Sequence, residues 1–223
     1  YLRYSRKKIL QSVRMIFEKE LFLKGYTIGL RPPNMDDMLK SGWNTWYNKI
    51  ETTRYNSHGV YPVSIEQEFE IIQNTLNQDN SILLAIHDLK STKILGNICL
   101  QNIDHFNRRA NLAITIGEPS PMTAGVEAFG LMTHHAFMRL NLERIEDGTH
   151  EKAMNFVKMV SIFGYQIDGI SKRYFFKNDA WSDKINFSII RPDYLRVLKE
   201  NSDNPLMSDL ATLQKQIVNS LKS

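Results

Sequence analysis

The stretch from Ile94 to Tyr165 constrains the fold most, because it alternates strand-like and helix-like patterns within a short length of chain. Its first two segments are rich in β-branched residues with polar residues between them, which is typical of strands. A polar turn at 107–109 separates them, so we expect an antiparallel hairpin. The expected elements are strands at Ile94–Ile103 and Asn111–Ile116, a helix at Thr123–Leu140, a strand at Arg144–Thr149 and a helix that stops at Gly164, a residue type suited to a left-handed helix end.

The helix expected at Thr123–Leu140 follows a strand and a proline-containing loop, and its apolar residues recur at helical spacing. The N–H groups in the first turn of a helix have no partner inside it, and with the helix dipole they favour an anion such as phosphate. Any helix after a strand has such an end, so the pattern alone is a weak signal. The expected donors belong to Met122, Thr123, Ala124, Gly125 and Val126.

A series of short motifs follows in order along the chain: Ile94-Leu95-Gly96-Asn97, Asn107-Arg108-Arg109-Ala110, Ile116-Gly117, Asn141-Leu142-Glu143-Arg144-Ile145, Gly148-Thr149, Phe163-Gly164-Tyr165, Lys172-Arg173-Tyr174-Phe175-Phe176-Lys177-Asn178 and Trp181-Ser182-Asp183. Together they resemble the GNAT superfamily of acetyl-CoA-dependent N-acetyltransferases. The resemblance covers about Tyr26 to Tyr194 and rests on the shared order, since each fragment alone is common. It is closest to the branch that includes ribosomal-protein N-terminal acetyltransferases and bacterial amino-sugar N-acetyltransferases.

The resemblance implies an α/β (α+β) GNAT fold, in which a mixed, mostly antiparallel sheet is flanked by helices. It also implies that acetyl-CoA lies in a V between two strands, with its pyrophosphate on the helix that opens near Thr123. The pantetheine arm would pair with the backbone of Ala113, Ile114, Thr115 and Ile116, and Asn155 in the last helix would lie near the cofactor. The amine would attack the thioester from the other side of the sheet.

Three positions depart from the family pattern and support a second hypothesis. The glycine-rich loop of the family is replaced by residues 121–125, of which only Gly125 is preserved in kind. Asn111 stands where many relatives have a glutamate base, and Ala153 stands where an asparagine often faces the cofactor. The alternative is therefore a GNAT fold that has lost catalysis and serves as a binding or structural subunit.

Direct attack requires a neutral amine, so the expected acceptor depends on basicity. A peptide α-amine has a pKa of about 7.7 to 8.0, whereas a lysine near 10.4 is almost entirely charged at pH 7. We therefore expect an amino sugar or a protein α-amine as acceptor, and a poor site for lysine. The candidate acids and bases are Glu118, His105 and His150, for which the alternative is an ordinary solvent-facing loop residue.

The segment after the first strand shapes the acceptor pocket in the family, and here it is rich in aromatic residues. Aromatic faces with a few polar groups could stack on a sugar or hold a peptide N-terminus. Ordinary packing explains the same pattern equally well. The candidate substrate-binding residues are Trp43, Trp46, Tyr55 and His58.

Length and composition narrow the remaining possibilities. The chain has 223 residues, of which 42% are hydrophobic, enough for one sizeable core. A net charge of +4 is too small to indicate nucleic-acid binding. The single cysteine, Cys99, excludes an internal disulfide and shows no metal-ligand spacing, so we expect no metal. No apolar run approaches the length of a membrane span and no signal peptide is visible, so we expect a cytoplasmic protein.

The chain divides into three expected parts. Residues 1–24 form a basic amphipathic helix, residues 25–194 form the GNAT-like domain, and residues 195–223 form a helical extension. The two terminal helices either pack on the domain or attach it to a second copy or another protein. The expected function is transfer of an acetyl group from acetyl-CoA to a small-molecule amine or a protein N-terminus.

Overall fold

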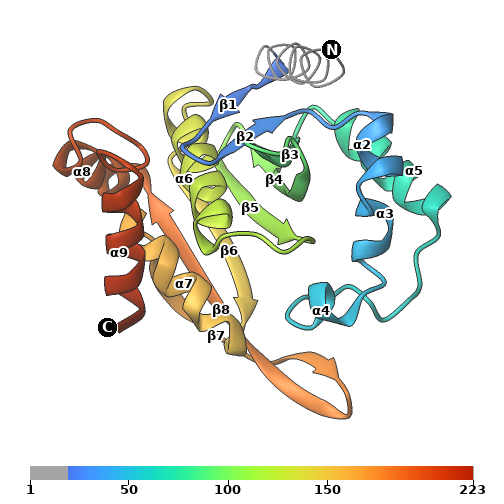
Figure 1. Cartoon of the computed structure of the whole chain (residues 1–223). Helices are drawn as coiled ribbons and strands as arrows, with labels where there is room; N and C mark the ends of the chain where they lie inside the picture. Colours follow the sequence, from blue (N-terminus) through green and yellow to red (C-terminus); the bar gives the residue numbers. More distant parts are fainter. Residues whose placement is uncertain (1–19, 223) are drawn as a thin grey trace, which may run out of the picture.

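An eight-stranded sheet forms the centre of the molecule, with strands in the order β1-β2-β3-β4-β5-β6-β8-β7 (Figure 1). The computed structural model describes residues 20–222. The elements are β1 (Leu23–Lys24), β2 (Ile28–Arg31), α2 (Met35–Lys40), α3 (Trp43–Trp46), α4 (Ile50–Thr53), α5 (Ile65–Leu76), β3 (Ile82–Asp88), β4 (Ile94–Asp104), β5 (Arg109–Ile116), α6 (Met122–Met138), β6 (Arg144–His150), α7 (Met154–Val160), β7 (Gln166–Lys177), β8 (Ala180–Ile190), α8 (Arg191–Glu200) and α9 (Leu210–Lys222).

The sheet is mixed and mostly antiparallel, which confirms the expected fold class. β4 and β5 form the predicted hairpin, with Ile98 opposite Ile114. The parallel pair is β5 with β6, and its register covers residues 109–111 and 144–146 alone. Beyond these residues the two strands diverge, so the sheet is forked at its centre.

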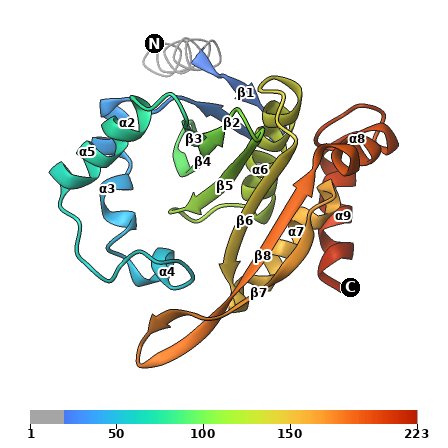
Figure 2. The same ribbon diagram turned by 180° about the vertical axis from the view of Figure 1, so that it is seen from behind.

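Helices cover both faces of the sheet and enclose two separate cores. The larger core packs α6, α7, α8 and α9 against one face, with Phe129, Phe137 and Leu112 fully buried. The smaller core lies on the opposite face under α2, α3 and α5, and Trp43 and Trp46 are its largest members. Figure 2, seen from behind, shows α2–α5 on one side of the forked sheet and α7–α9 on the other.

The sequence predicts helix starts at Asn34, which precedes acidic residues, and at Ser64, which Gln67 follows three residues later, and the capping geometry confirms both. The Asn34 side chain accepts from the N–H of Asp37, and the Asp37 carboxylate accepts from the N–H of Asn34. Ser64 and Gln67 form the same reciprocal pair at the start of α5.

Helical spacing predicts a buried apolar stripe on α5 made of Ile65, Phe69, Ile72 and Leu76, and this prediction is wrong at both of its ends. Ile65 and Leu76 are exposed, whereas Ile72 is buried. The polar Glu68 is also buried, with 4% of its surface exposed. α5 packs against α3 and β3, and Ile72 belongs to the smaller core.

The terminal segments differ in part from the expectation. The predicted N-terminal helix lies outside the described residues up to position 19, and its predicted end is wrong because Leu23–Lys24 pairs with β2 as a strand. At the other end, the predicted C-terminal helix is present as α9, and its Leu213 and Ile217 are buried in the larger core. Of the two alternatives for this helix, packing on its own domain is the one observed. The expected boundary at residue 194 falls inside α8.

A buried carboxylate joins the first hairpin to the central helix. Glu127 of α6 is fully buried and accepts hydrogen bonds from the N–H groups of Tyr26 and Thr27 at 2.7 and 2.9 Å. The Thr27 hydroxyl donates to its other oxygen at 2.5 Å. These bonds satisfy the carboxylate inside the core, where an unpaired one would be costly.

Candidate active site

A cleft of about 610 Å³ lies in the fork between β5 and β6. Ala113 to Ile116 of β5 form one wall, and Asp147 to Thr149 of β6 form the other. Within the described chain, no strand pairs with this edge of β5 beyond Asn111. Peptide groups along that edge are therefore available to an extended ligand.

The start of α6 closes one end of the cleft. Of the five predicted N–H donors, Met122, Gly125 and Val126 line it, whereas Thr123 and Ala124 are buried and do not. Among the described residues no side chain caps this helix, which begins after Pro121. A methyl group at Gly125 would meet Ile116 only at an ordinary contact distance of 3.6 Å, so the wall has room there.

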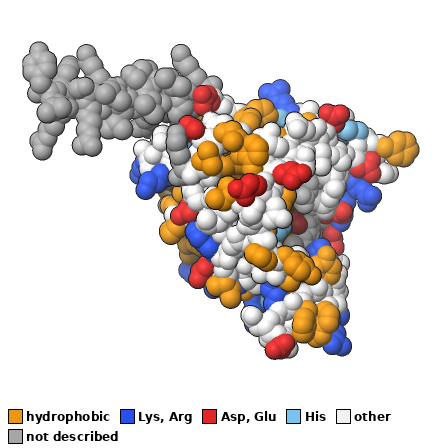
Figure 3. All heavy atoms as spheres, turned by 90° about the vertical axis from the view of Figure 1, so that its right-hand side faces the viewer, with side chains coloured by type: hydrophobic (Ala, Val, Ile, Leu, Met, Phe, Trp, Pro, Cys, Tyr) orange, Lys and Arg blue, Asp and Glu red, His pale blue; other side chains and the backbone are white. Residues whose placement is uncertain are grey.

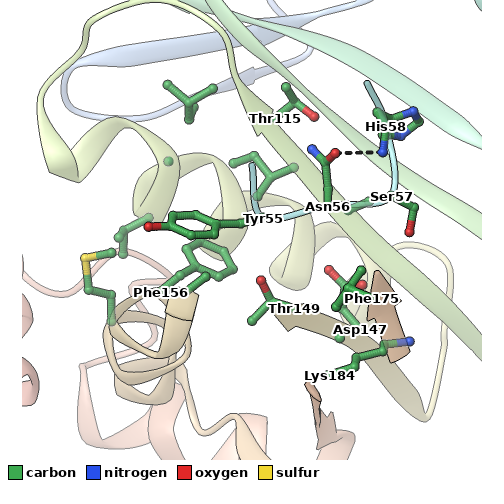
Figure 4. Close-up of a pocket in the computed structure, with 18 of the residues that line it drawn as sticks. Tyr55, Asn56, Ser57, His58, Thr115, Asp147, Thr149, Phe156, Phe175 and Lys184 are labelled. Carbon is green, nitrogen blue, oxygen red and sulfur yellow. Dashed lines mark hydrogen bonds between the residues drawn. The ribbon is translucent and has the colours of Figure 1, made fainter. Parts of the chain in front are cut away.

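Asp147 is a titratable group of the cleft that the sequence analysis missed. Burial raises its pKa to about 7, against the opposing effects of the Gly148 N–H and the Lys184 ammonium. Figure 4 shows Asp147, Thr149, Phe175 and Lys184 grouped on one side of the cleft. The sequence did contain a signal for this residue. Asp147 follows Ile145 by two positions in a strand, so both side chains lie on the same face, and Ile145 is buried.

The segment 55–58 lies across the cleft from Asp147, and it brings the predicted Tyr55 and His58 to the site (Figure 4). The His58 N–H donates to the Asn56 side chain at 2.9 Å, and its ring lies 4.6 Å from the ring of Tyr47. Partial loss of hydration and the charge of Lys177 lower the pKa of His58, so its imidazole is mainly neutral at pH 7.

Trp43 and Trp46, which the sequence predicts to bind substrate, do not line this cleft. Both rings are buried and stack at 5.5 Å with an interplanar angle of 12°. Their indole N–H groups donate to the carboxylates of Glu68 and Glu118 at 3.1 and 2.9 Å. Both rings belong to the smaller core, together with Met38, Ile72 and Leu83.

The structure does not bring the predicted acids and bases together. Glu118 is held by Trp46 and borders a separate surface pocket beside Asp37 and Lys93. His105 is exposed in the turn after β4 and does not line the cleft. His150 is buried behind the cleft, where its ring stacks on Phe175 at 5.3 Å and its Nδ1 accepts from the Lys152 N–H.

Asn155, which is predicted to lie near the cofactor, is exposed on α7 and does not line the cleft. Ala153, which precedes α7, does line it. Two residues along a helix turn the side chain by about 200°, which accounts for the difference. Asn111, at the position of the family base, hydrogen-bonds to Asn102 at 3.1 Å and does not line the cleft either.

No group of three His, Cys, Asp or Glu side chains among the described residues could hold a metal ion. No helix in that part of the chain has the length and apolar character needed to cross a bilayer. Burial raises the pKa of the Cys99 thiol to about 11.

Comparison with known proteins gives the family. The profile of the acetyltransferase (GNAT) domain matches residues 27–161. "Probable N-acetyltransferase YjcK" of Bacillus subtilis (strain 168) is 25% identical over 182 residues, which cover 77% of this chain and 98% of that protein.

Solved structures share the fold at lower identity. The spermidine N-acetyltransferase from Vibrio cholerae in complex with CoA and spermine is 18% identical, with a TM-score of 0.63 over 76% of this chain and 98% of the other. A GCN5-related N-acetyltransferase from Brucella melitensis is 19% identical, with a TM-score of 0.63 over 87% and 93%. These relatives do not support the ribosomal-protein and amino-sugar branch in particular. The match over residues 27–161 and the forked sheet together show that the chain belongs to the acetyltransferase (GNAT) family.

Proposed function

We propose that the chain is an N-acetyltransferase that moves an acetyl group from acetyl-CoA to a primary amine. The observation that carries this proposal is the cleft in the fork between β5 and β6. It crosses the sheet, so it offers one side to a cofactor and the other to an acceptor. On the α6 side it is lined by Ile114, Ile116 and Gly125, and on the opposite side by Ala113 and Thr115.

The residues of the cleft suit the parts of acetyl-CoA. Peptide groups of Ala113 to Ile116 would hold the amide-containing arm, because no strand in residues 20–222 pairs with that edge of β5. The first turn of α6, at Met122 and Gly125, would hold the pyrophosphate through backbone N–H groups and the helix dipole. When bound, acetyl-CoA supplies an acetyl group activated as a thioester.

The amine must lose a proton during transfer, and His58 is the base that the cleft best supports. Its imidazole is mainly neutral at pH 7 and lies on the acceptor side. Asp147 is another titratable group of the cleft, and with a pKa of about 7 it can hold or release a proton near neutrality. We propose that His58 accepts the proton from the amine. Asp147 would change the charge of the cleft as it gains or loses its own proton.

The acceptor class is open among three primary amines. The sequence argument favours an amino sugar or a protein α-amine, because a weakly basic amine needs little help to become neutral. The Vibrio cholerae relative, in contrast, is named a spermidine N-acetyltransferase. A strongly basic amine would depend more on a base such as His58.

A catalytically inactive, binding or structural role is the second candidate. It is supported by Pro121 before α6, by Asn111 turned away from the cleft and by Ala153 in the cleft wall. Loss of a base at one position does not remove catalysis where another group is placed to act, and His58 is such a group. The two candidates therefore differ first in cofactor binding.

Calorimetric titration of acetyl-CoA into the purified chain tests the proposal. We expect saturable binding at micromolar affinity, lost in Gly125→Asp because a carboxylate would repel the pyrophosphate. Gly125→Ala is the matched control, since the structure has room for its methyl group. If the folded wild type does not bind acetyl-CoA at millimolar concentration, the proposed acetyltransferase activity is wrong and the binding or structural role is favoured.

A further inference from the structure

A second pocket, of about 230 Å³, lies on the acceptor side of the sheet beneath α5. Its walls include Trp43, Tyr47, Glu68, Asn97 and Cys99. We call it the Glu68 pocket. It shares His58, Gln101, Ala113 and Thr115 with the cleft in the fork, so the two cavities meet at the face of β5.

Glu68 is the one acidic side chain among the described residues that line this pocket, and no Lys or Arg lines it. The carboxyl is nearly enclosed, with 4% of the residue exposed. Its one hydrogen bond in the described structure comes from the Trp43 indole at 3.1 Å, and no ion pair joins it to a described cation. A buried carboxylate without a counter-ion is costly, so a cationic ligand would be stabilised here.

The other walls suit a compact cation on an alkyl chain. The faces of Trp43 and Tyr47 can contact an ammonium group favourably, and Ile72 and Leu83 can contact methylene groups. The Tyr47 hydroxyl, which lies 3.5 Å from the Thr115 hydroxyl and 3.4 Å from the Asn97 amide, continues the polar wall toward β5. A volume of about 230 Å³ suits the end of a short alkyl chain with one ammonium group.

We propose that the acceptor is a short linear diamine, whose unreacted ammonium group enters the Glu68 pocket and pairs with Glu68. Its other amine then lies where the two cavities meet, beside His58 and Thr115. This assignment rests on the proposed acetyltransferase function and names its substrate class. It makes Glu68 a residue that determines specificity, without contact with the reacting amine.

The test compares three ligands of equal chain length, of which the first carries ammonium groups and the other two carry none: diaminobutane, butanediol and butanol. Binding is measured by calorimetry in the presence of CoA, so that no turnover occurs. We expect diaminobutane to bind the wild type about 10- to 100-fold more tightly than the other two, as for a hydrogen bond to a buried charge. Glu68→Gln should abolish this difference while keeping an acceptor for the Trp43 indole. Glu70→Gln, on the exposed face of the same helix, should preserve it.

The outcomes separate this inference from the proposed function. If CoA binds and the wild type holds all three ligands equally, the Glu68 assignment is wrong and the acetyltransferase proposal stands. If CoA does not bind but diaminobutane still stabilises the wild type selectively against heat, the pocket is a diamine site on a chain that is not an acetyltransferase. The wild-type comparison needs no substitution, so it decides the matter even if Glu68→Gln is unstable.

Discussion

The Lys177 ammonium donates a hydrogen bond of 2.6 Å to the backbone carbonyl of His58, which lies 119 residues earlier in the chain. The same nitrogen donates to the Thr53 carbonyl at 2.6 Å. The hairpin of β7 and β8 thereby reaches across to the segment that covers the acceptor side of the cleft. Figure 3 shows hydrophobic side chains on the lower projection, where Figure 1 places this hairpin, and Phe176 and Trp181 are exposed there.

Lys177→Met should loosen this cover while leaving the cofactor site intact. Two charge-assisted hydrogen bonds are lost, so we expect unfolding to become easier by about 1 to 3 kcal/mol. The KM for the amine should rise about tenfold as the His58 backbone loses its support. Steady-state kinetics and urea unfolding measure both effects. Lys172→Met is the control because Lys172 is exposed and pairs with Asp183 of the neighbouring strand, away from His58. Equal effects from the two variants would contradict the proposed role of Lys177.

His58→Gln should lower kcat by about 100-fold with the acetyl-CoA affinity unchanged, because general bases typically contribute that much. The pKa of His58 is lowered below its usual value of 6.5, so wild-type activity should fall as pH drops below that value. The variant should lack this acidic limb. His105→Gln, in an exposed turn away from the cleft, should behave as wild type. A loss of activity in His105→Gln alone would return the base to the residue predicted from sequence.

Asp147→Asn should change the pH dependence of stability. The folded-state pKa is raised from 3.8 to about 7, so the folded chain binds more protons than the unfolded chain between these values. Stability must therefore fall as pH rises from about 4 to 7. The fall is at most about 4 kcal/mol, and less because solvent reaches the cleft. The free energy of unfolding in urea should differ less between pH 5 and pH 8 for the variant than for the wild type. The same difference in both proteins would show that Asp147 does not have a raised pKa in the folded chain.

Gly117→Ala should destabilise the smaller core. A methyl group there would lie 2.0 Å from the Trp46 ring, which is fully buried and has no room to move. We expect a loss of about 1 to 3 kcal/mol, typical of overpacking. Gly169→Ala is the control, because a methyl group there meets nothing within 4 Å. Thermal unfolding of the two variants distinguishes a steric effect from a general cost of replacing glycine.

Cys99 should resist thiol reagents in the folded protein. Burial raises its pKa to about 11, so the reactive thiolate is scarce at pH 8. A disulfide reagent should label it only after unfolding in urea. Rapid labelling of the native chain would show that the Glu68 pocket opens readily to solvent.

Local sequence patterns determined most of the fold. Strand alternation gave the hairpin of β4 and β5, and reciprocal capping at Asn34 and Ser64 marked two helix starts. Gly164 has a φ of 103° and ends its helix in the left-handed region, as predicted. These features depend on residues a few positions apart, so a single sequence contains the information for them.

The composition of the site was decided by tertiary packing. Trp43 and Trp46 follow the same aromatic pattern as Tyr55, yet they are buried whereas Tyr55 borders the cleft. Asp147 faces the cleft because β6 diverges from β5 after Glu146. Glu68 lines a pocket because α5 lies over a cavity. Which side chain faces a cavity depends on how elements distant in sequence pack together. Local periodicity places a residue on a face of its own element and carries no information about what that face meets.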